Sequence, residues 1–348
     1  MTRKTAVLIC PGRGTYNAPE LGYLGRHHAS RTELLARFDA LRSETGQEPV
    51  TALDAAPKFQ PALHTRGDAA SPLIYACSYL DALAIDRERI DIVAVTGNSM
   101  GWYIALACAG AVSPEAGFRI VNTMGTLMQE RLIGGQLVYP FVDADWQEIP
   151  GRRAGILDKM SEIAAREGHD LAVSIALGGM LVLAGNDAGL RAFEAEMPRI
   201  DDRFPMRLKN HAAFHTALQA PVATEGQACL GPDLFGAPDV PLIDGRGQIW
   251  WPGATDSAAL RDYTLGHQVT EAYDFSRAIQ TAAREFAPDL FIITGPGTTL
   301  GGATAQALIQ ADWRGMAGKT DFQTKQKATP LLVSMGLDDQ RFAVTKGE

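Results

Sequence analysis

The sequence predicts an α/β fold in which a parallel sheet is interrupted by a smaller ferredoxin-like unit. Short apolar runs at residues 6–10, 92–96 and 290–294 each end in a glycine-containing turn, which is typical of a buried parallel strand. Between the second and third runs the pattern changes to strand, helix, strand, strand, helix and strand. Since that is the element order of a ferredoxin-like unit, we expect residues 131–210 to form a small subdomain inserted between residues 1–130 and 211–348 of the large one.

The individual elements follow from apolar spacing and from helix-start signals. A helix is expected over residues 71–84, because Ser71 and Pro72 form a helix-start signal, and another over residues 102–111. The inserted unit is expected to hold strands at 135–142, 171–177, 181–184 and 204–209, with helices at 156–167 and 187–196. A helix at 272–286 then leads into the strand at 290–294.

Composition narrows the class of protein and its partners. The hydrophobic share of 46% and the charged share of 21% are typical of a globular chain. With Lys+Arg 32 against Asp+Glu 40, the net charge of -8 provides no basic surplus for nucleic acid. The four cysteines have no CxxC spacing and no disulfide-scaffold density. The first apolar run is too short for a signal peptide and no stretch reaches membrane-spanning length, so we expect a cytoplasmic protein with no membrane partner.

The most specific chemical motif is Gly97-Asn98-Ser99-Met100-Gly101. It fits the G-x-S-x-G nucleophile elbow, whose glycines permit the tight turn that lifts a serine above the ends of the strands. The predicted strand before it and the predicted helix after it supply the context that this motif requires. We therefore expect an α/β-hydrolase-like large subdomain with Ser99 as nucleophile.

A serine nucleophile needs a base within hydrogen-bond reach, and His215 is the best placed of the seven histidines. It follows the predicted small subdomain, where the chain re-enters the large one. His211 stands four residues earlier, which is also the spacing of two metal ligands on one helix face. No HExxH glutamate accompanies the pair, so we expect no metal there. No other motif implies a tightly bound cofactor, and none is expected.

Five ordered segments resemble the malonyl-CoA:acyl-carrier-protein transacylase family, the acyltransferases of fatty acid and polyketide biosynthesis. Residues 11–15 (PGRGT) are similar to the family's Pro-Gly-Gln-Gly-Ser loop, and residues 97–102 to its Gly-His-Ser-x-Gly-Glu elbow. Residues 128–130 (MQE), 214–218 (FHTAL) and 295–297 (GPG) resemble three further family segments in the same order. The resemblance extends from about residue 6 to residue 303.

The resemblance implies acyl transfer from coenzyme A, a substrate here and not a cofactor, to the phosphopantetheine thiol of an acyl carrier protein. Ser99 would carry the acyl group, with His215 as general acid and base. The backbone N–H groups of Met100 and Arg13 would form the oxyanion hole, and the main-chain carbonyl of Gln268 would orient the histidine. The two turns would depend on their glycines for backbone geometry that a larger residue would disturb. These glycines are Gly12, Gly14, Gly97 and Gly101. A basic segment at residues 203–209 is a candidate docking patch for an acidic carrier protein, and a solvated strand end is the alternative.

The sequence departs from the family at the acyl pocket. Malonyl-specific members carry an arginine where this chain has Met124, and Asn98, Trp102 and Ser71 stand where the family has histidine, glutamate and glutamine. A thioether cannot replace a guanidinium that holds a carboxylate. Either Arg13 supplies the missing cation for a malonyl-type group, or Met124 and Trp102 line an apolar pocket for a non-carboxylated acyl group.

The pair Ser99 and His215 is also compatible with a second function, that of a proofreading thioesterase, which hydrolyses acyl thioesters. The choice depends on whether water or the carrier thiol reaches the acyl-enzyme. A non-catalytic carrier-binding relative is a further alternative, which the retained serine, histidine and glycine turns disfavour.

Overall fold

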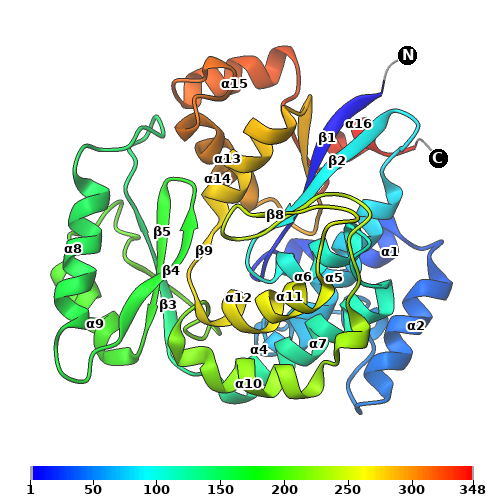
Figure 1. Ribbon diagram of the computed structural model, residues 1–348, viewed down its shortest axis with the longest axis horizontal. Coiled ribbons are helices and arrows are strands. Elements are labelled where there is room, and N and C mark those ends of the chain that lie inside the picture. Colours follow the sequence, from blue (N-terminus) through cyan, green and yellow to red (C-terminus); the bar gives the residue numbers. More distant parts are fainter. Residues whose placement is uncertain (1–2, 347–348) are drawn as a thin grey trace.

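The computed structural model describes residues 3 to 346 and contains two sheets with helices packed around them (Figure 1). The larger sheet has the strand order β11-β10-β1-β2-β7-β8. Its strands are β1 (Lys4–Cys10), β2 (Ile90–Gly97), β7 (Leu242–Ile243), β8 (Ile249–Trp250), β10 (Leu290–Ile293) and β11 (Leu332–Ser334). The predicted α/β class is confirmed. The sheet is mixed, however, because β8 runs antiparallel to β7 across a connection too short for a parallel crossover.

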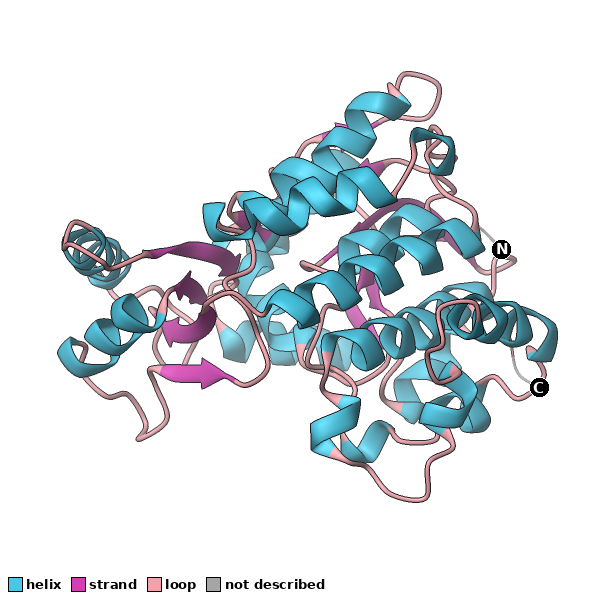
Figure 2. Ribbon diagram, turned by 90° about the horizontal axis from the view of Figure 1, so that it is seen from below, coloured by secondary structure: helices cyan, strands magenta, loops and turns pink. Residues whose placement is uncertain are grey.

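The central strands of this sheet are buried and helices lie on both sides of them (Figure 2). Helix α6 (Gly101–Cys108) contacts β1 and β2, and it packs against α5 (Gly67–Ala84) and α7 (Pro114–Arg131). Helix α13 (Phe275–Phe286) contacts β2 and β7 and reaches the smaller sheet at β4 (Leu171–Leu177), while α14 (Leu300–Gln310) packs against α13. The two sheets are therefore joined through a shared helix layer.

Helix α5 corrects one predicted boundary. It begins at Gly67, and Pro72 lies inside it, not at its start. A proline lacks the N–H that would bind the carbonyl four residues earlier. That carbonyl, of Asp68, instead accepts a hydrogen bond of 2.7 Å from the buried guanidinium of Arg42. A side chain from a distant helix thus satisfies the acceptor that the proline leaves open.

The smaller sheet has the order β6-β3-β5-β4-β9. Strands β3 (Gly135–Pro140), β4, β5 (Met180–Gly185) and β6 (Met206–Leu208) are antiparallel neighbours and have the ferredoxin-like order, with α8 (Arg152–Ala164) and α9 (Asp187–Glu196) on the outer face (Figure 1). Residues 272–274 were expected to be helical, but β9 (Tyr273–Asp274) adds a fifth strand parallel to β4. The subdomain boundaries at residues 131 and 210 stay a prediction.

The remaining elements are helices and single turns that connect these parts. They are η1 (Ala18–Glu20), α1 (Tyr23–His27), α2 (Thr32–Ser43), α3 (Val50–Asp54), α4 (Pro61–His64), η2 (Ala217–Gln219), α10 (Ala220–Cys229), η3 (Pro232–Leu234), α11 (Ser257–Asp262), η4 (Tyr263–His267), α12 (Gln268–Thr270), η5 (Trp313–Gly315), α15 (Lys319–Ala328) and α16 (Asp338–Val344). Over residues 3 to 346, no helix is both long and apolar enough to cross a membrane.

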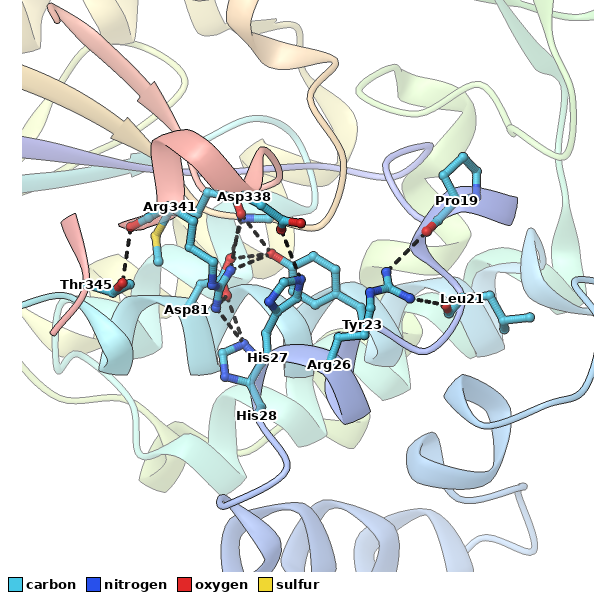
Figure 3. A network of polar contacts seen from close by, with 12 residues as sticks. Pro19, Leu21, Tyr23, Arg26, His27, His28, Asp81, Asp338, Arg341 and Thr345 are labelled. Carbon is cyan, nitrogen blue, oxygen red and sulfur yellow. Dashed lines mark hydrogen bonds and ion pairs between the residues drawn. The ribbon is translucent and has the colours of Figure 1, made fainter. Parts of the chain in front are cut away.

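A buried polar cluster ties both ends of the chain to the large sheet (Figure 3). Asp81 of α5 is fully buried and accepts hydrogen bonds from Arg341 of α16 at 2.5 Å and from Tyr23 of α1 at 2.8 Å. His28 also lies 2.8 Å from Asp81, and the backbone N–H of Gly295, after β10, donates to it at 2.7 Å. The carboxylate therefore connects four segments that are far apart in the sequence.

Candidate active site

Ser99 lies on a sharp turn between β2 and α6. Its φ of 55° is in the left-handed region, which a non-glycine residue rarely adopts. A Cβ on Gly97 would collide with the carbonyl oxygen of Gly101, and a Cβ on Gly101 would collide with that of Cys10. The turn can form only because both positions are glycine, and it places Ser99 above the end of β2.

The Ser99 hydroxyl lies next to the ring of His215. Ser99 Oγ lies 2.7 Å from His215 Nε2, although the two residues are 116 positions apart in the chain. His215 is buried, has a φ of 57° and lies in a turn, outside any helix. The predicted Ser–His pair is thus brought within hydrogen-bond distance.

The second nitrogen of His215 fixes the tautomer. Nδ1 lies 2.6 Å from the main-chain oxygen of Gln268, which can only accept a hydrogen bond. The proton is therefore on Nδ1, and Nε2 presents its lone pair to the serine hydroxyl. Burial lowers the pKa of His215 to about 4, against the opposing effect of the Gln268 carbonyl, so the imidazole is neutral near pH 7. A neutral imidazole can accept the serine proton.

Both polar atoms of the Gln268 side-chain amide make hydrogen bonds. Its Nε2 donates to the main-chain oxygen of Ser99 at 3.0 Å, and its Oε1 accepts from the hydroxyl of Tyr103 at 3.0 Å. The residue follows the π-helical turn η4, an irregularity that is frequent at functional sites. Gln268 therefore links the segment behind His215 to the elbow.

The predicted oxyanion donors lie beside this pair. Within residues 3 to 346, the backbone N–H groups of Met100 and Arg13 have no hydrogen-bond acceptor. The loop that carries Arg13 packs closely on the elbow, because a Cβ on Gly12 would lie 2.6 Å from the carbonyl oxygen of Asn98. Gly14 has a φ of 89°, which turns the loop away after Arg13. Two free N–H groups near a nucleophile are suited to hold developing negative charge.

A cavity of about 520 Å³ opens in front of Ser99. Of the predicted site residues, Arg13, Gly14, Ser71, Asn98, Ser99, Met100, His215 and Gln268 line it. Met124 and Trp102 do not, which corrects the prediction that they form an acyl pocket. Met124 is fully buried against Gly226 of α10, and Trp102 is fully buried with its Nε1 donating to Thr264 at 2.9 Å.

A buried hydrogen-bond chain that the sequence did not reveal supports the segment carrying His215. Ser174 donates to the carbonyl of Phe214 at 2.7 Å, and Gln136 Nε2 donates to Ser174 Oγ at 2.6 Å. Gln136 Oε1 is then left to accept from Nδ1 of His211 at 2.8 Å. Burial, with a smaller effect of the Arg13 charge, lowers the pKa of His211 to about 3. Residues this far apart, with no motif, give no sequence signal.

The structure also places two other features of the sequence, the His211–His215 spacing and the basic segment 203–209. His211 and His215 do not share a helix face, because their segment is not helical. Within residues 3 to 346 no group of three or more potential ligand side chains could hold a metal ion. The basic segment 203–209 is partly neutralised, since Arg207 pairs with Glu194 at 2.8 Å.

Comparisons with known proteins agree with this fold. No family model matches the chain. A malonyl CoA-acyl carrier protein transacylase of Salmonella typhimurium is 25% identical over 301 residues, which cover 85% of this chain and 90% of that protein. A non-reducing polyketide synthase of Neosartorya fischeri is 27% identical over 308 residues, or 84% of this chain and 16% of that much longer protein.

Solved structures show the same fold. The malonyl-CoA:acyl carrier protein transacylase of Xanthomonas oryzae has a TM-score of 0.74 and 18% identity, over 99% of this chain and 100% of that one. A malonyl-transacylase in complex with its type II polyketide acyl-carrier protein has a TM-score of 0.70 and 18% identity, over 97% and 99%. The resemblance drawn from the five motifs is confirmed: this chain is a homologue of the malonyl-CoA:acyl carrier protein transacylases.

Proposed function

We propose that this chain is an acyltransferase that moves an acyl group from coenzyme A to the phosphopantetheine thiol of an acyl carrier protein. The observation that carries the proposal is the contact of 2.7 Å between Ser99 Oγ and His215 Nε2, with Nδ1 of the same ring bound to a carbonyl. The homologous transacylases support transfer to a carrier thiol over the hydrolytic alternative. The cytoplasmic location stays a prediction.

In the first step, Ser99 Oγ attacks the thioester carbonyl while His215 Nε2 takes its proton. The Oγ–C bond forms and the carbonyl oxygen becomes an oxyanion, which the N–H groups of Met100 and Arg13 would stabilise. The C–S bond then breaks, and the imidazolium returns the proton to the departing coenzyme A thiolate. The product is an acyl ester on Ser99 and free coenzyme A.

In the second step the carrier's thiol takes the place of coenzyme A. His215 removes its proton, the sulfur attacks the acyl ester, and the C–Oγ bond breaks as Ser99 recovers a proton from the ring. No aspartate takes part, because the acceptor behind the histidine is the Gln268 carbonyl. A neutral acceptor stabilises the imidazolium less than a carboxylate would, so the ring passes its proton on readily.

The test follows the acyl label after it reaches the enzyme. Purified protein is loaded with radiolabelled malonyl-CoA, separated from coenzyme A, and mixed with holo-acyl carrier protein or with buffer. We expect the label to move to the carrier thiol much faster than into free acid. Rapid release as free malonate at an equal rate with and without carrier would establish a hydrolase instead.

A further inference from the structure

The segment that carries His215 has no regular secondary structure. Residues 211–216 belong to neither a helix nor a strand, and His215 has a φ of 57° in the left-handed region. Such a conformation is strained for a residue with a Cβ, and it persists only where the surrounding structure holds it. The ring nitrogens contact Gln268 and Ser99, but neither contact holds the backbone before the ring. Other contacts must therefore set the conformation of that backbone.

Ser174 of β4 makes such a contact. Its hydroxyl donates to the main-chain oxygen of Phe214, the residue before His215, at 2.7 Å. The side chain of Ser174 is fully buried, so the bond is shielded from water. The carbonyl of Phe214 and the nitrogen of His215 belong to the same planar peptide. A rotation of this peptide would turn the His215 side chain relative to Ser99, and the bond from Ser174 opposes that rotation.

Two further side chains orient the hydroxyl of Ser174. The main-chain oxygen of Phe214 can only accept, so Ser174 donates to it and accepts from Gln136 Nε2 at 2.6 Å. Gln136 Oε1 then accepts from Nδ1 of His211 at 2.8 Å. All three bonds run in one direction, from His211 to Phe214. Because hydrogen bonds in one direction polarise each other, the first two strengthen the bond that Ser174 makes.

A β-bulge in β4 explains why Ser174 faces this segment. On β4, Val173 and Ile175 pair with adjacent residues of β5, which leaves Ser174 as an extra residue between them. Side chains alternate along a regular strand, so without the bulge Val173 and Ile175 would share a face. Instead, Val173 packs on the core under α8 and α9, whereas Ile175 lines the cavity. The bulge therefore re-aims this part of β4 toward the active site.

We propose that Ser174 is a positioning residue for the base His215 and acts by fixing the peptide that joins Phe214 to it. Gln136 keeps the Ser174 hydroxyl in the donating direction. This inference rests on the proposed function, because it concerns the same Ser99–His215 pair. It gives the small sheet a part in the reaction, although neither member of the pair belongs to that sheet.

The first experiment measures the rate of Ser99 acylation over a range of malonyl-CoA concentrations. Ser174→Ala should lower the maximal rate by about tenfold to a hundredfold, because misplacing a catalytic group by about 1 Å can cost about a hundredfold. The concentration at half-maximal rate should change by less than about twofold, because Ser174 is not one of the residues that line the cavity. Ser174→Thr keeps the hydroxyl, and its rate should stay within about threefold of the wild type.

Ser276→Ala is the matched control. Ser276 is also a buried serine that bonds to the end of β4, because it accepts from the N–H of Gly178 at 2.8 Å and donates to the oxygen of Ala176 at 3.3 Å. The control should lower the free energy of unfolding, as Ser174→Ala does, but leave acylation unchanged. A rate in Ser174→Ala equal to that of the wild type, or an equal fall in Ser276→Ala, would overturn the inference.

A double-mutant cycle with His215→Ala tests whether Ser174 acts through the base. If it does, Ser174→Ala should slow acylation in the wild type, but by less than about twofold when His215 is already alanine. The same fall in both backgrounds would mean that Ser174 supports the fold or the bound donor and not His215. That result would contradict the inference.

A reagent that needs no coenzyme A separates this inference from the proposed function. A fluorophosphonate reacts with an activated serine: the Oγ–P bond forms, fluoride leaves, and His215 takes the serine proton. We expect this labelling of Ser99 to slow in Ser174→Ala by a factor similar to that for acylation. Labelling that depends on Ser174, without any acyl transfer to the carrier, would contradict the proposed function alone. Acyl transfer at a rate independent of Ser174 would contradict this inference alone.

Discussion

The pH dependence of Ser99 acylation tests the state of His215. The base must be neutral to accept the serine proton, so the rate follows its deprotonated fraction. With a pKa of about 4, roughly 90% of the ring is neutral at pH 5, whereas an ordinary histidine of pKa about 6.5 would be only about 3% neutral. The rate should therefore fall by only about a tenth between pH 7 and pH 5, and not by the roughly 25-fold expected for a pKa of about 6.5.

The assay is a single-turnover measurement of the Ser99 adduct by rapid quench between pH 4.5 and pH 8. An acyl-pantetheine is the donor, because it lacks the phosphates of coenzyme A that titrate near pH 6. Circular dichroism at each pH confirms that the protein stays folded. An acid limb with an apparent pKa near 6.5 would refute the reasoning, since it would mean that the ring is exposed to water when it reacts.

Three further predictions concern the scaffold of the site. Gly101→Ala should abolish acylation and lower stability, because its Cβ would collide with the backbone of Cys10; adduct formation and thermal unfolding measure the two effects. Tyr273→Phe should lower the free energy of unfolding by about 1 kcal/mol in urea titrations, because its hydroxyl makes a buried hydrogen bond of 2.6 Å to the end of β2. Asp81→Asn should cost about 3 to 5 kcal/mol by leaving a buried guanidinium unpaired (Figure 3), and the exposed Asp338→Asn should cost little.

Much of the fold was predictable because its signals are local. The strand before Ser99 and the helix after it follow from short apolar runs and glycine turns, and β4 and α9 have the predicted bounds. The start of α5 was not predictable from Pro72. A proline inside a helix is tolerated here because Arg42, far away in sequence, satisfies the open carbonyl. Strand β9 was not predicted because it also depends on a distant segment. Its two residues form a strand only through their pairing with β4.

In the site, too, local sequence motifs predict some residues, whereas others depend on contacts between segments far apart in the sequence. The elbow and His215 follow from motifs, but the cavity wall does not. Met124 and Trp102 seemed to define the pocket because they replace polar family residues, yet both are packed into the core away from it. The chain from Gln136 to the segment of His215 depends on which strands become neighbours. Only tertiary structure determines that.

The most direct test of the central claim is the rate of Ser99 acylation in His215→Ala. Intact-mass spectrometry after rapid mixing with malonyl-CoA measures the adduct in the wild type, in His215→Ala and in Ser99→Ala. We predict one acyl increment on Ser99 in the wild type, formation about 10² to 10⁴ times slower in His215→Ala, and none at that position in Ser99→Ala. Acylation of Ser99 at an unchanged rate without the imidazole, or an adduct on another residue of the wild type, would contradict the account.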